Sequence, residues 1–287
     1  MTSLPPPSVK KLGLVIDLDT CVGCQACATS CKEWNTQGYS APLTDENPYG
    51  ADPSGVWLNR IHGYEVTEQG QAQSRIVHFP RSCLHCEEPA CVTVCPTGAS
   101  YKRAEDGIVL VNPETCIGCK LCSWACPYGA REYDQAHGVM KKCTLCVDRI
   151  YNENFAAEDR IPACVKACPT GAIQFGSKED MKDYAAKRVE DLKERGYDQA
   201  GLYDPQGVGG THVMYVLHHA DQPNLYAGLP VNPSISPLVG LWKGFAKPLA
   251  TLALAGVALG SLFHYVTKGP NEVSKEIEDE IEKEDAQ

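Results

Sequence analysis

Cysteine is the residue type whose number and spacing in this chain could do chemistry. The 287 residues include 16 cysteines, and all of them lie between Cys21 and Cys168. This is far more than the core thiols of an ordinary protein and too few for a small disulfide-stapled scaffold. Closely spaced thiolates ligate metals, so we expect these residues to hold a metal ion or a metal cluster.

The cysteines fall into four groups of four. The first and third groups share the spacing C-x2-C-x2-C-x3-C, and proline follows the last cysteine of the second, third and fourth groups. In runs of this spacing, three cysteines ligate one [4Fe–4S] cluster and the fourth ligates a neighbouring cluster. Structural zinc usually joins two separate C-x2-C pairs, so zinc is the weaker interpretation. The groups are Cys21, Cys24, Cys27 and Cys31; Cys83, Cys86, Cys91 and Cys95; Cys116, Cys119, Cys122 and Cys126; and Cys143, Cys146, Cys164 and Cys168.

Crossed ligation predicts four complete [4Fe–4S] clusters with no cysteine left over. The adjacent second and third groups exchange their fourth cysteines, and the first and fourth groups pair around them. The expected ligand sets are Cys21, Cys24, Cys27 and Cys168 (cluster 1); Cys31, Cys143, Cys146 and Cys164 (cluster 2); Cys83, Cys86, Cys91 and Cys126 (cluster 3); and Cys95, Cys116, Cys119 and Cys122 (cluster 4). Clusters bound entirely by thiolates offer no open iron to a substrate, so we expect one-electron transfer.

No other side chains form a catalytic pattern. The sequence contains no phosphate-binding glycine loop and no nucleophile–base pairing that stands out. We expect His85, which lies between two cysteines, and His218–His219 to pack or to form hydrogen bonds. The chain is therefore predicted to conduct electrons and not to be an enzyme by itself.

An internal repeat indicates how the cysteines are positioned. Residues 89–99 and 162–172 are identical at nine of eleven positions, including both cysteines and the Pro-Thr-Gly-Ala that follows. We therefore expect an α+β fold with two interleaved ferredoxin-like units, each holding two [4Fe–4S] clusters, within residues 1–180. Residues 81–141 would form one unit, and residues 12–80 with 142–177 the other.

Short apolar runs beside the cysteine groups predict strands, and a charged periodic segment predicts a helix. The strands are expected at 12–18, 56–66, 75–79, 108–111 and 172–175, with the second and third forming a hairpin. Residues 36–55 are rich in glycine and proline, which predicts a loop-rich insertion. The helix is expected at 178–195, where Gly196 would end it.

The C-terminal part is predicted to contact partners and to enter a membrane. Residues 181–237 are expected to form an extended arm that contacts partner subunits, with one strand-like run at 213–217. Pro248–Thr267 carries no formal charge and is long enough to span ~30 Å of hydrocarbon, so residues 238–268 are assigned as one transmembrane anchor. A buried helix of a soluble protein is the alternative. We expect His264 to be a packing or interfacial residue, with haem ligation as the alternative.

Charge excludes one class of function. The formal net charge is −10, and the stretch from Glu272 to Asp285 has eight acidic residues against two lysines. Residues 269–287 thus read as a solvated acidic tail, and no basic stripe suggests nucleic-acid binding. The N-terminus lacks a signal peptide, so a partner would have to direct export. The lysines on the two sides of the span nearly balance, which leaves its orientation open.

The cysteine groups resemble the four-cluster electron-transfer subunits that partner molybdenum or tungsten oxidoreductases, such as dimethyl sulfoxide, polysulfide and nitrate reductases. Three segments are more specific: Cys143-Thr-Leu-Cys-Val-Asp-Arg149, the stretch from Gly209 to Tyr226, and Phe263-His-Tyr265 in the terminal span. They resemble the iron–sulfur (beta) subunit of respiratory, membrane-bound formate dehydrogenase over residues 12 to 270. Nitrate-reductase-type relatives carry Trp at a third-group position and a three-iron cluster, whereas Cys119 is intact here.

The resemblance implies partners and a route. A molybdopterin catalytic (alpha) subunit with molybdenum or tungsten would oxidise formate, and electrons would arrive at cluster 1 and leave from cluster 4. A cytochrome b (gamma) subunit would pass them through haem b to quinone. The resemblance also implies the inner membrane, with the globular part in the periplasm. Two alternatives stay open: the same role beside another molybdopterin enzyme, of sulfur-compound, nitrate or dimethyl sulfoxide type, and a zinc-rich membrane-anchored interaction protein.

Overall fold

The computed structural model describes residues 4–6, 8, 10–36, 56–67, 74–226, 228–269, 277 and 283. The predicted loop-rich insertion at 36–55 and the acidic tail lie almost wholly outside the described residues. The chain divides into two units, residues 1–235 and 236–287. Each unit is described by itself.

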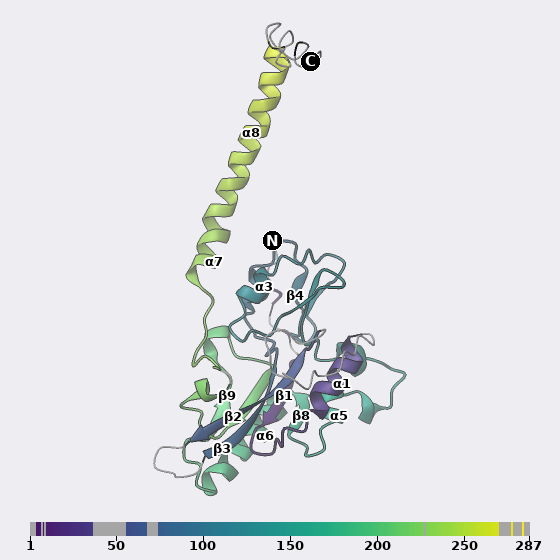
Figure 1. Ribbon diagram of the computed structural model, residues 1–287, viewed down its shortest axis with the longest axis vertical. Coiled ribbons are helices and arrows are strands. Elements are labelled where there is room, and N and C mark those ends of the chain that lie inside the picture. The colour runs from purple at the N-terminus through teal and green to yellow at the C-terminus, as the bar shows by residue number, and fades with distance from the viewer. Residues whose placement is uncertain are drawn as a thin grey trace. The chain divides into compact units, whose positions relative to one another are not determined.

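A four-stranded mixed sheet is the centre of the first unit (Figure 1). Its strand order is β8 (Ile173–Ser177), β1 (Leu12–Asp17), β10 (Val213–Leu217) and β9 (Gly201–Tyr203). β1 pairs antiparallel with β8 and parallel with β10. Every residue of β1 and β10 is buried, as expected for central strands whose two faces are both covered.

Helix α6 (Lys178–Glu194) packs on this sheet and confirms the predicted helix at 178–195. Its apolar side, which includes the fully buried Leu192, contacts a core cluster with Val15 and Met214. The Ser177 hydroxyl caps the first turn by accepting a hydrogen bond from the Asp180 N–H at 3.1 Å. Gly196 follows the helix with a φ of 93°, a conformation that glycine adopts without strain.

The expectation of an extended arm over 181–237 is wrong for much of that segment. It begins inside α6, and residues 201–203 and 213–217 supply two strands of the central sheet. The predicted run at 213–217 is a strand, but it is paired between β1 and β9 and not on an arm. The prediction failed because the glycines and prolines around this short run indicate a loop. The strand that pairs with it, β1, lies near the other end of the chain and leaves no local signal.

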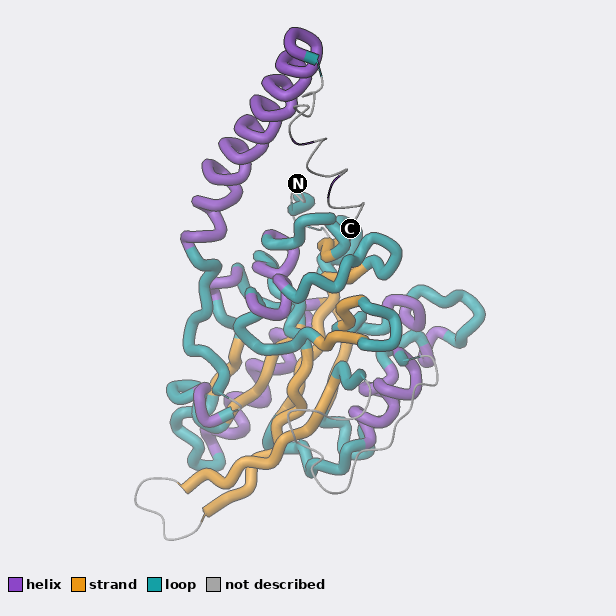
Figure 2. The backbone as a smooth tube through the Cα atoms, turned by 45° about the horizontal axis from the view of Figure 1, so that its top comes forward, coloured by secondary structure: helices purple, strands orange, loops and turns teal. Residues whose placement is uncertain are grey.

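Three β-hairpins complete the first unit (Figure 2). They pair β2 (Asn59–Thr67) with β3 (Ser74–Ser82), β4 (Ser100–Lys102) with β5 (Val109–Val111), and β6 (Glu132–Asp134) with β7 (Val139–Lys141). The strands predicted at 56–66, 75–79, 108–111 and 172–175 correspond to β2, β3, β5 and β8. Three short 3₁₀ turns lie at Ala157–Asp159, Gln206–Val208 and Pro223–Leu225.

The remaining helices of this unit are short and lie within or directly after cysteine groups. They are α1 (Ala26–Asn35), α2 (Ala90–Thr93), α3 (Leu121–Trp124), α4 (Val147–Ile150) and α5 (Ala163–Lys166). Helix α1 contacts α5, and α2 contacts α3. These contacts join the first cysteine group to the fourth, and the second group to the third.

The described part of the second unit is helical. It consists of α7 (Pro237–Leu241), a π-helical turn at Trp242–Ala246 and α8 (Lys247–Lys268). The helical segment of residues 237–268 is long and apolar enough to cross a membrane. Large apolar side chains such as Val257 and Phe263 are exposed all along α8. A helix that is apolar on every side and unburied is suited to lipid, which argues against the alternative of a buried soluble helix.

Candidate iron–sulfur sites

The first set of thiols brings the two ends of the cysteine-containing region together. Cys21, Cys24 and Cys27 lie on the loop between β1 and α1 and at the start of that helix, and Cys168 follows α5. Burial first, and then the neighbouring Cys21, Cys168 and Cys24 thiols, raise the pKa of Cys27 to about 12. Cys168 is thus close to two cysteines of the first group, as crossed ligation requires.

The second set combines one cysteine of the first group with three of the fourth. Burial, and then the adjacent Cys143, Cys164 and Cys146 thiols, raise the pKa of Cys31 well above its usual value. Cys31 lies in α1 and Cys164 in α5, and the contact between these helices holds the two residues together. The amide of Asn35 donates to the sulfurs of Cys31 and Cys146 at 3.6 and 3.7 Å.

The third set lines a single cavity. Cys83, Cys86, Cys91 and Cys126 all contribute to its wall, together with apolar residues and Arg131. Burial, followed by the Cys83, Cys91 and Cys126 thiols, raises the pKa of Cys86 well above its usual value. The cavity therefore joins three cysteines of the second group to the last cysteine of the third.

The fourth set is recognised through Cys122. Burial raises the pKa of Cys122 to about 11, Arg131 opposes this, and the Cys91, Cys95 and Cys116 thiols add to it. Cys95 and Cys116 belong to the expected fourth set, whereas Cys91 belongs to the third. Cys119, on the same loop, is exposed to solvent.

Contacts between sets follow a linear order. Cys27 of the first set interacts with Cys31 and Cys164 of the second. Cys143 of the second interacts with Cys83 of the third, and Cys91 of the third interacts with Cys122 of the fourth. All 16 cysteines are described, and only Cys24 in the first set and Cys119 in the fourth are exposed.

The four cysteine loops share one backbone bend. The second residue after the first cysteine of each group has a positive φ: Gly23 at 69°, His85 at 49°, Gly118 at 64° and Leu145 at 51°. Glycine takes this left-handed conformation freely, whereas for other residues it costs ~1–2 kcal/mol. His85 and Leu145 therefore adopt a strained conformation that keeps the same loop shape. The C-x-G-C signal in two groups indicates this bend, and the other two lack the glycine.

Backbone N–H groups point at the sulfurs. His85, Leu145, Met140 and Ser100 each donate from the main chain to a cysteine sulfur, Cys83, Cys143, Cys116 and Cys95 respectively, at 3.4 Å. Such bonds stabilise thiolates and tune the potential of a cluster that the thiolates hold.

The last cysteines of the repeated Cys-Pro-Thr-Gly motifs have equivalent surroundings. Burial would raise the pKa of Cys95, but hydrogen bonds from the Ser100 N–H and from Thr97 lower it below its usual value. Burial would likewise raise the pKa of Cys168, but hydrogen bonds from Thr170 and from the Ile173 N–H outweigh this effect and lower the pKa below its usual value. They are two of the four cysteines expected to cross between partner groups; the other two are Cys31 and Cys126.

The donor set fits an iron–sulfur cluster better than a single ion. Among the described residues, which include every cysteine, no three Cys, His, Asp or Glu side chains are arranged to hold one metal ion. A structural zinc needs four ligands around one ion, whereas the thiols of a [4Fe–4S] site bind different irons and lie further apart. The sets of four sulfurs, approached by N–H donors, match the arrangement of a [4Fe–4S] site.

The histidines form hydrogen bonds, as expected. His85 is fully buried, and its Nδ1 accepts a bond from the Val109 N–H at 3.1 Å. His218 Nε2 lies 3.0 Å from Asp19 Oδ1, and His219 Nδ1 lies 3.0 Å from the Tyr226 hydroxyl. They serve the structure of the first unit.

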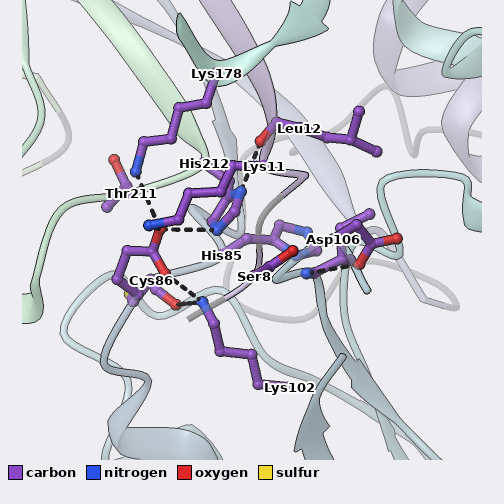
Figure 3. A network of polar contacts seen from close by, with 12 residues as sticks. Ser8, Lys11, Leu12, His85, Cys86, Lys102, Asp106, Lys178, Thr211 and His212 are labelled. Carbon is purple, nitrogen blue, oxygen red and sulfur yellow. Dashed lines mark hydrogen bonds and ion pairs between the residues drawn. The ribbon is translucent and has the colours of Figure 1, made fainter. Parts of the chain in front are cut away.

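A polar network anchors the second cysteine group to the sheet, and sequence analysis missed it (Figure 3). Glu87, directly after Cys86, accepts from Lys11 at 2.8 Å and from Lys102 at 2.9 Å, with His212 at 3.5 Å. Burial opposes ionisation, but these cations lower the pKa of Glu87 far below its usual value. The partners come from separate segments of the chain, so no local pattern could have indicated the network.

Comparison with known families identifies the same features. The description "4Fe-4S dicluster domain" matches residues 74–178, and "4Fe-4S binding domain" matches 18–34. The description "Formate dehydrogenase N, transmembrane" matches residues 235–278, which include α7 and α8.

The formate dehydrogenase iron–sulfur subunit of Haemophilus influenzae is 45% identical over 94% of this chain and 84% of its own length. The chain belongs to the family of formate dehydrogenase iron–sulfur subunits. The iron–sulfur subunit of the nitrate-inducible formate dehydrogenase of Escherichia coli is 43% identical over 98% of this chain and 94% of its own. These matches confirm the resemblance, the [4Fe–4S] cofactors and the mixed helix–strand fold with one membrane anchor.

A further relative of this iron–sulfur subunit comes from a sulfite dehydrogenase. That protein, from Allochromatium vinosum, is 56% identical over 71% of this chain and 86% of its own length. Its identity is higher than that of the formate dehydrogenase subunits, but its match covers a smaller part of this chain.

Proposed function

We propose that this chain carries electrons from a formate-oxidising molybdopterin subunit, through four [4Fe–4S] clusters, to a cytochrome b subunit that reduces quinone. The linear order of the four thiol sets, with one exposed cysteine at each end, carries the proposal. A row of closed metal sites suits conduction, because it links two surfaces without offering a site to a substrate.

The proposed ligand sets are those of crossed ligation: Cys21, Cys24, Cys27 and Cys168; Cys31, Cys143, Cys146 and Cys164; Cys83, Cys86, Cys91 and Cys126; and Cys95, Cys116, Cys119 and Cys122. The proximity of the thiols supports the first three sets in full and, in the fourth, joins Cys95 and Cys116 to Cys122; Cys119 is included because of its spacing in the third group. The pairing of β1 with β8, and the α1–α5 and α2–α3 contacts, support two interleaved units, 81–141 and 12–80 with 142–177.

A [4Fe–4S] cluster bound in this way accepts and releases one electron at a time. The protein's own groups set the conditions for that. Thiolates would hold the irons, main-chain N–H groups such as that of Met140 donate to the sulfurs, and every cysteine of the two middle sets is buried or partly buried. The strained loops at His85 and Leu145 keep the donors aimed inward.

Direction and sidedness complete the proposal. Electrons would arrive at the set containing Cys24 and leave from the set containing Cys119. Residues 238–268 would anchor the chain in the inner membrane, with the cysteine-containing unit in the periplasm beside the catalytic subunit. The match of the C-terminal segment to a formate dehydrogenase transmembrane domain supports the anchor.

A second candidate is the same conducting role beside a sulfite-oxidising molybdopterin subunit. The 56% identity to the sulfite dehydrogenase protein favours it. The longer coverage by formate dehydrogenase subunits, which extends over nearly the whole chain, favours the first candidate.

Purification of the detergent-solubilised complex tests both candidates. We expect a brown complex with about 16 iron atoms per copy of this chain, a molybdopterin subunit and a haem b subunit, which reduces a quinone analogue with formate. Quinone reduction with sulfite but not with formate would reject the first candidate in favour of the second. A colourless chain containing zinc would reject both.

A further inference from the structure

Arg131 is a buried cation with no acidic partner among the described residues. Its side chain lies just before β6, and the residue is 5% exposed. Its Nη2 donates to the Ser100 hydroxyl at 2.9 Å, and no carboxylate of the described residues forms an ion pair with it. An uncompensated charge in the interior is costly, so such a residue requires negative charge nearby.

The neighbours of Arg131 are thiols of two sets. It interacts with Cys91 and Cys83 of the third set and with Cys122 of the fourth. It lines the same cavity as all four cysteines of the third set. The buried Nη1 has no well-made hydrogen bond with any described residue, but the guanidinium lies close enough to the Cys91 thiol for a weak one. A donor directed at one of these sulfurs thus borders the space that the four sulfurs enclose.

We propose that Arg131 donates from Nη1 to the cluster held by Cys83, Cys86, Cys91 and Cys126 and raises its reduction potential. The guanidinium stays charged at any physiological pH, so it provides a fixed positive charge. Reduction adds one negative charge to a cluster, and a nearby cation in a medium of low dielectric constant stabilises the reduced form. The cluster held with Cys122 is affected in the same direction, but less, because the cavity that Arg131 lines is that of the third set.

The Ser100 hydroxyl positions this charge. It accepts from Nη2 and so fixes the plane of the guanidinium, while the Ser100 N–H donates to Cys95 of the fourth set. One residue therefore links the arginine to both sets. Arg131 is a positioning and tuning residue, and it does not ligate iron.

The experiment is a redox titration, followed by electron paramagnetic resonance, of the purified complex carrying Arg131→Gln or Arg131→Met. Both variants remove the charge, and methionine also preserves much of the volume. Arg131→Lys keeps the charge. Arg103→Gln is the matched control, because it makes the same change in net charge at a residue paired with Asp106.

We expect the neutral variants to retain full iron and to have two of the four midpoint potentials lowered. The larger shift, that of the cluster held by Cys83, Cys86, Cys91 and Cys126, should be about 59 mV, which corresponds to a tenfold change in the equilibrium constant of a one-electron reduction. Arg131→Lys should stay near the wild type, and Arg103→Gln should leave all four potentials unchanged. Loss of about four irons in both neutral variants, with retention in Arg131→Lys, would equally support a requirement for the charge.

Unchanged potentials in an iron-replete neutral variant would overturn the inference. Loss of iron from Arg131→Lys together with the neutral variants would also overturn it, because it would show that Arg131 serves only in packing. The inference rests on the function proposed above, and the two fail separately: absence of iron–sulfur signals in the wild-type complex rejects the function, whereas unshifted signals reject only the role of Arg131.

Discussion

Cys95 and Cys168 occupy equivalent positions in the two copies of a repeated motif, and each comes to lie beside cysteines of another group. Both receive a main-chain N–H and a threonine hydroxyl, which together lower the pKa of the thiol despite burial. A thiolate that is stabilised before metal binding is well suited to complete a cluster whose other three ligands come from a distant loop. The repeat thus preserves the chemistry of the crossing ligand together with its sequence.

Cys168→Ala should remove the cluster of the first set and so interrupt electron transfer where electrons enter. In the purified complex, we expect iron to fall by about a quarter and formate-dependent quinone reduction to be lost, while the catalytic subunit still reduces an artificial dye. Iron analysis and the two assays test this. The control is Thr170→Val, which removes only the hydroxyl near the sulfur and should retain the iron. A Cys168→Ala complex with full iron would contradict the proposed set.

Asp19 allows a test of how much an ionised carboxylate contributes to the stability of the first unit. Burial opposes its ionisation, but bonds from Arg195 and His218 lower its pKa from 3.8 to about 2. A carboxyl group whose pKa is lower in the folded than in the unfolded chain stabilises the fold at any pH above its unfolded pKa. This contribution is lost as the pH falls from about 4 towards 2. Asp19→Asn should therefore cost about 1–2 kcal/mol at pH 7, allowing for solvent screening.

The measurement is the difference in urea midpoint between Asp19→Asn and the wild type at several pH values. The difference should be constant between pH 7 and 5 and should narrow only below about pH 4. A difference that narrows already between pH 7 and 5 would show that another group controls this contact. Asp198→Asn, at an exposed residue, provides the matched control.

Among the elements, β10 shows most clearly how a short segment can be misjudged from its surroundings. Its five residues are fully buried between β1 and β9, yet glycines and prolines surround it in the sequence. Its parallel partner, β1, is separated from it by all four cysteine groups. The pairing that gives the segment its role is therefore between residues far apart in the chain, and it is invisible to local propensity.

Met214 tests whether β10 belongs to the core. It is completely buried and packs in the cluster between the sheet and α6. Met214→Ala should lower the free energy of unfolding by ~2–5 kcal/mol, because it leaves a cavity in a packed interior. Thermal unfolding of the purified protein measures this, with Lys193→Ala on the exposed side of α6 as control. A melting temperature equal to that of the control would contradict the packing.

The contrast between β10 and the cysteine loops shows what sequence can predict. Cysteine spacing carries its chemistry locally, so the grouping of the 16 thiols and the proposed crossing of Cys95 and Cys168 can be predicted from a few residues at a time. Strand and helix positions beside those groups are also predictable from local patterns. Arg131 and Glu87 are not, because each acquires its partners from several segments that only the folded chain brings together.

At the scale of the whole molecule, all of the thiols are in one unit and the membrane-spanning helix is in the other. A chain ending at Ile235 retains every cysteine and the complete sheet. We expect it to assemble with the iron content of the full chain and to stay in solution without detergent, whereas the full chain requires detergent. Iron analysis and gel filtration, with the full chain as control, test this. A truncated chain that aggregates without iron would show that the helix is needed for assembly.

The order of the strands also has a consequence for how the protein is made. Of the described strands, β1 is the first to leave the ribosome, but both of its neighbours, β8 and β10, follow the last cysteine. The central strand must wait for its parallel partner until the chain has been synthesised beyond Val213. Long-range pairing of this kind is slow and exposes a nascent chain to aggregation. The chain is therefore expected to depend on cellular factors that shield it while iron and sulfide are delivered, and its sheet can close only after the last ligand has emerged.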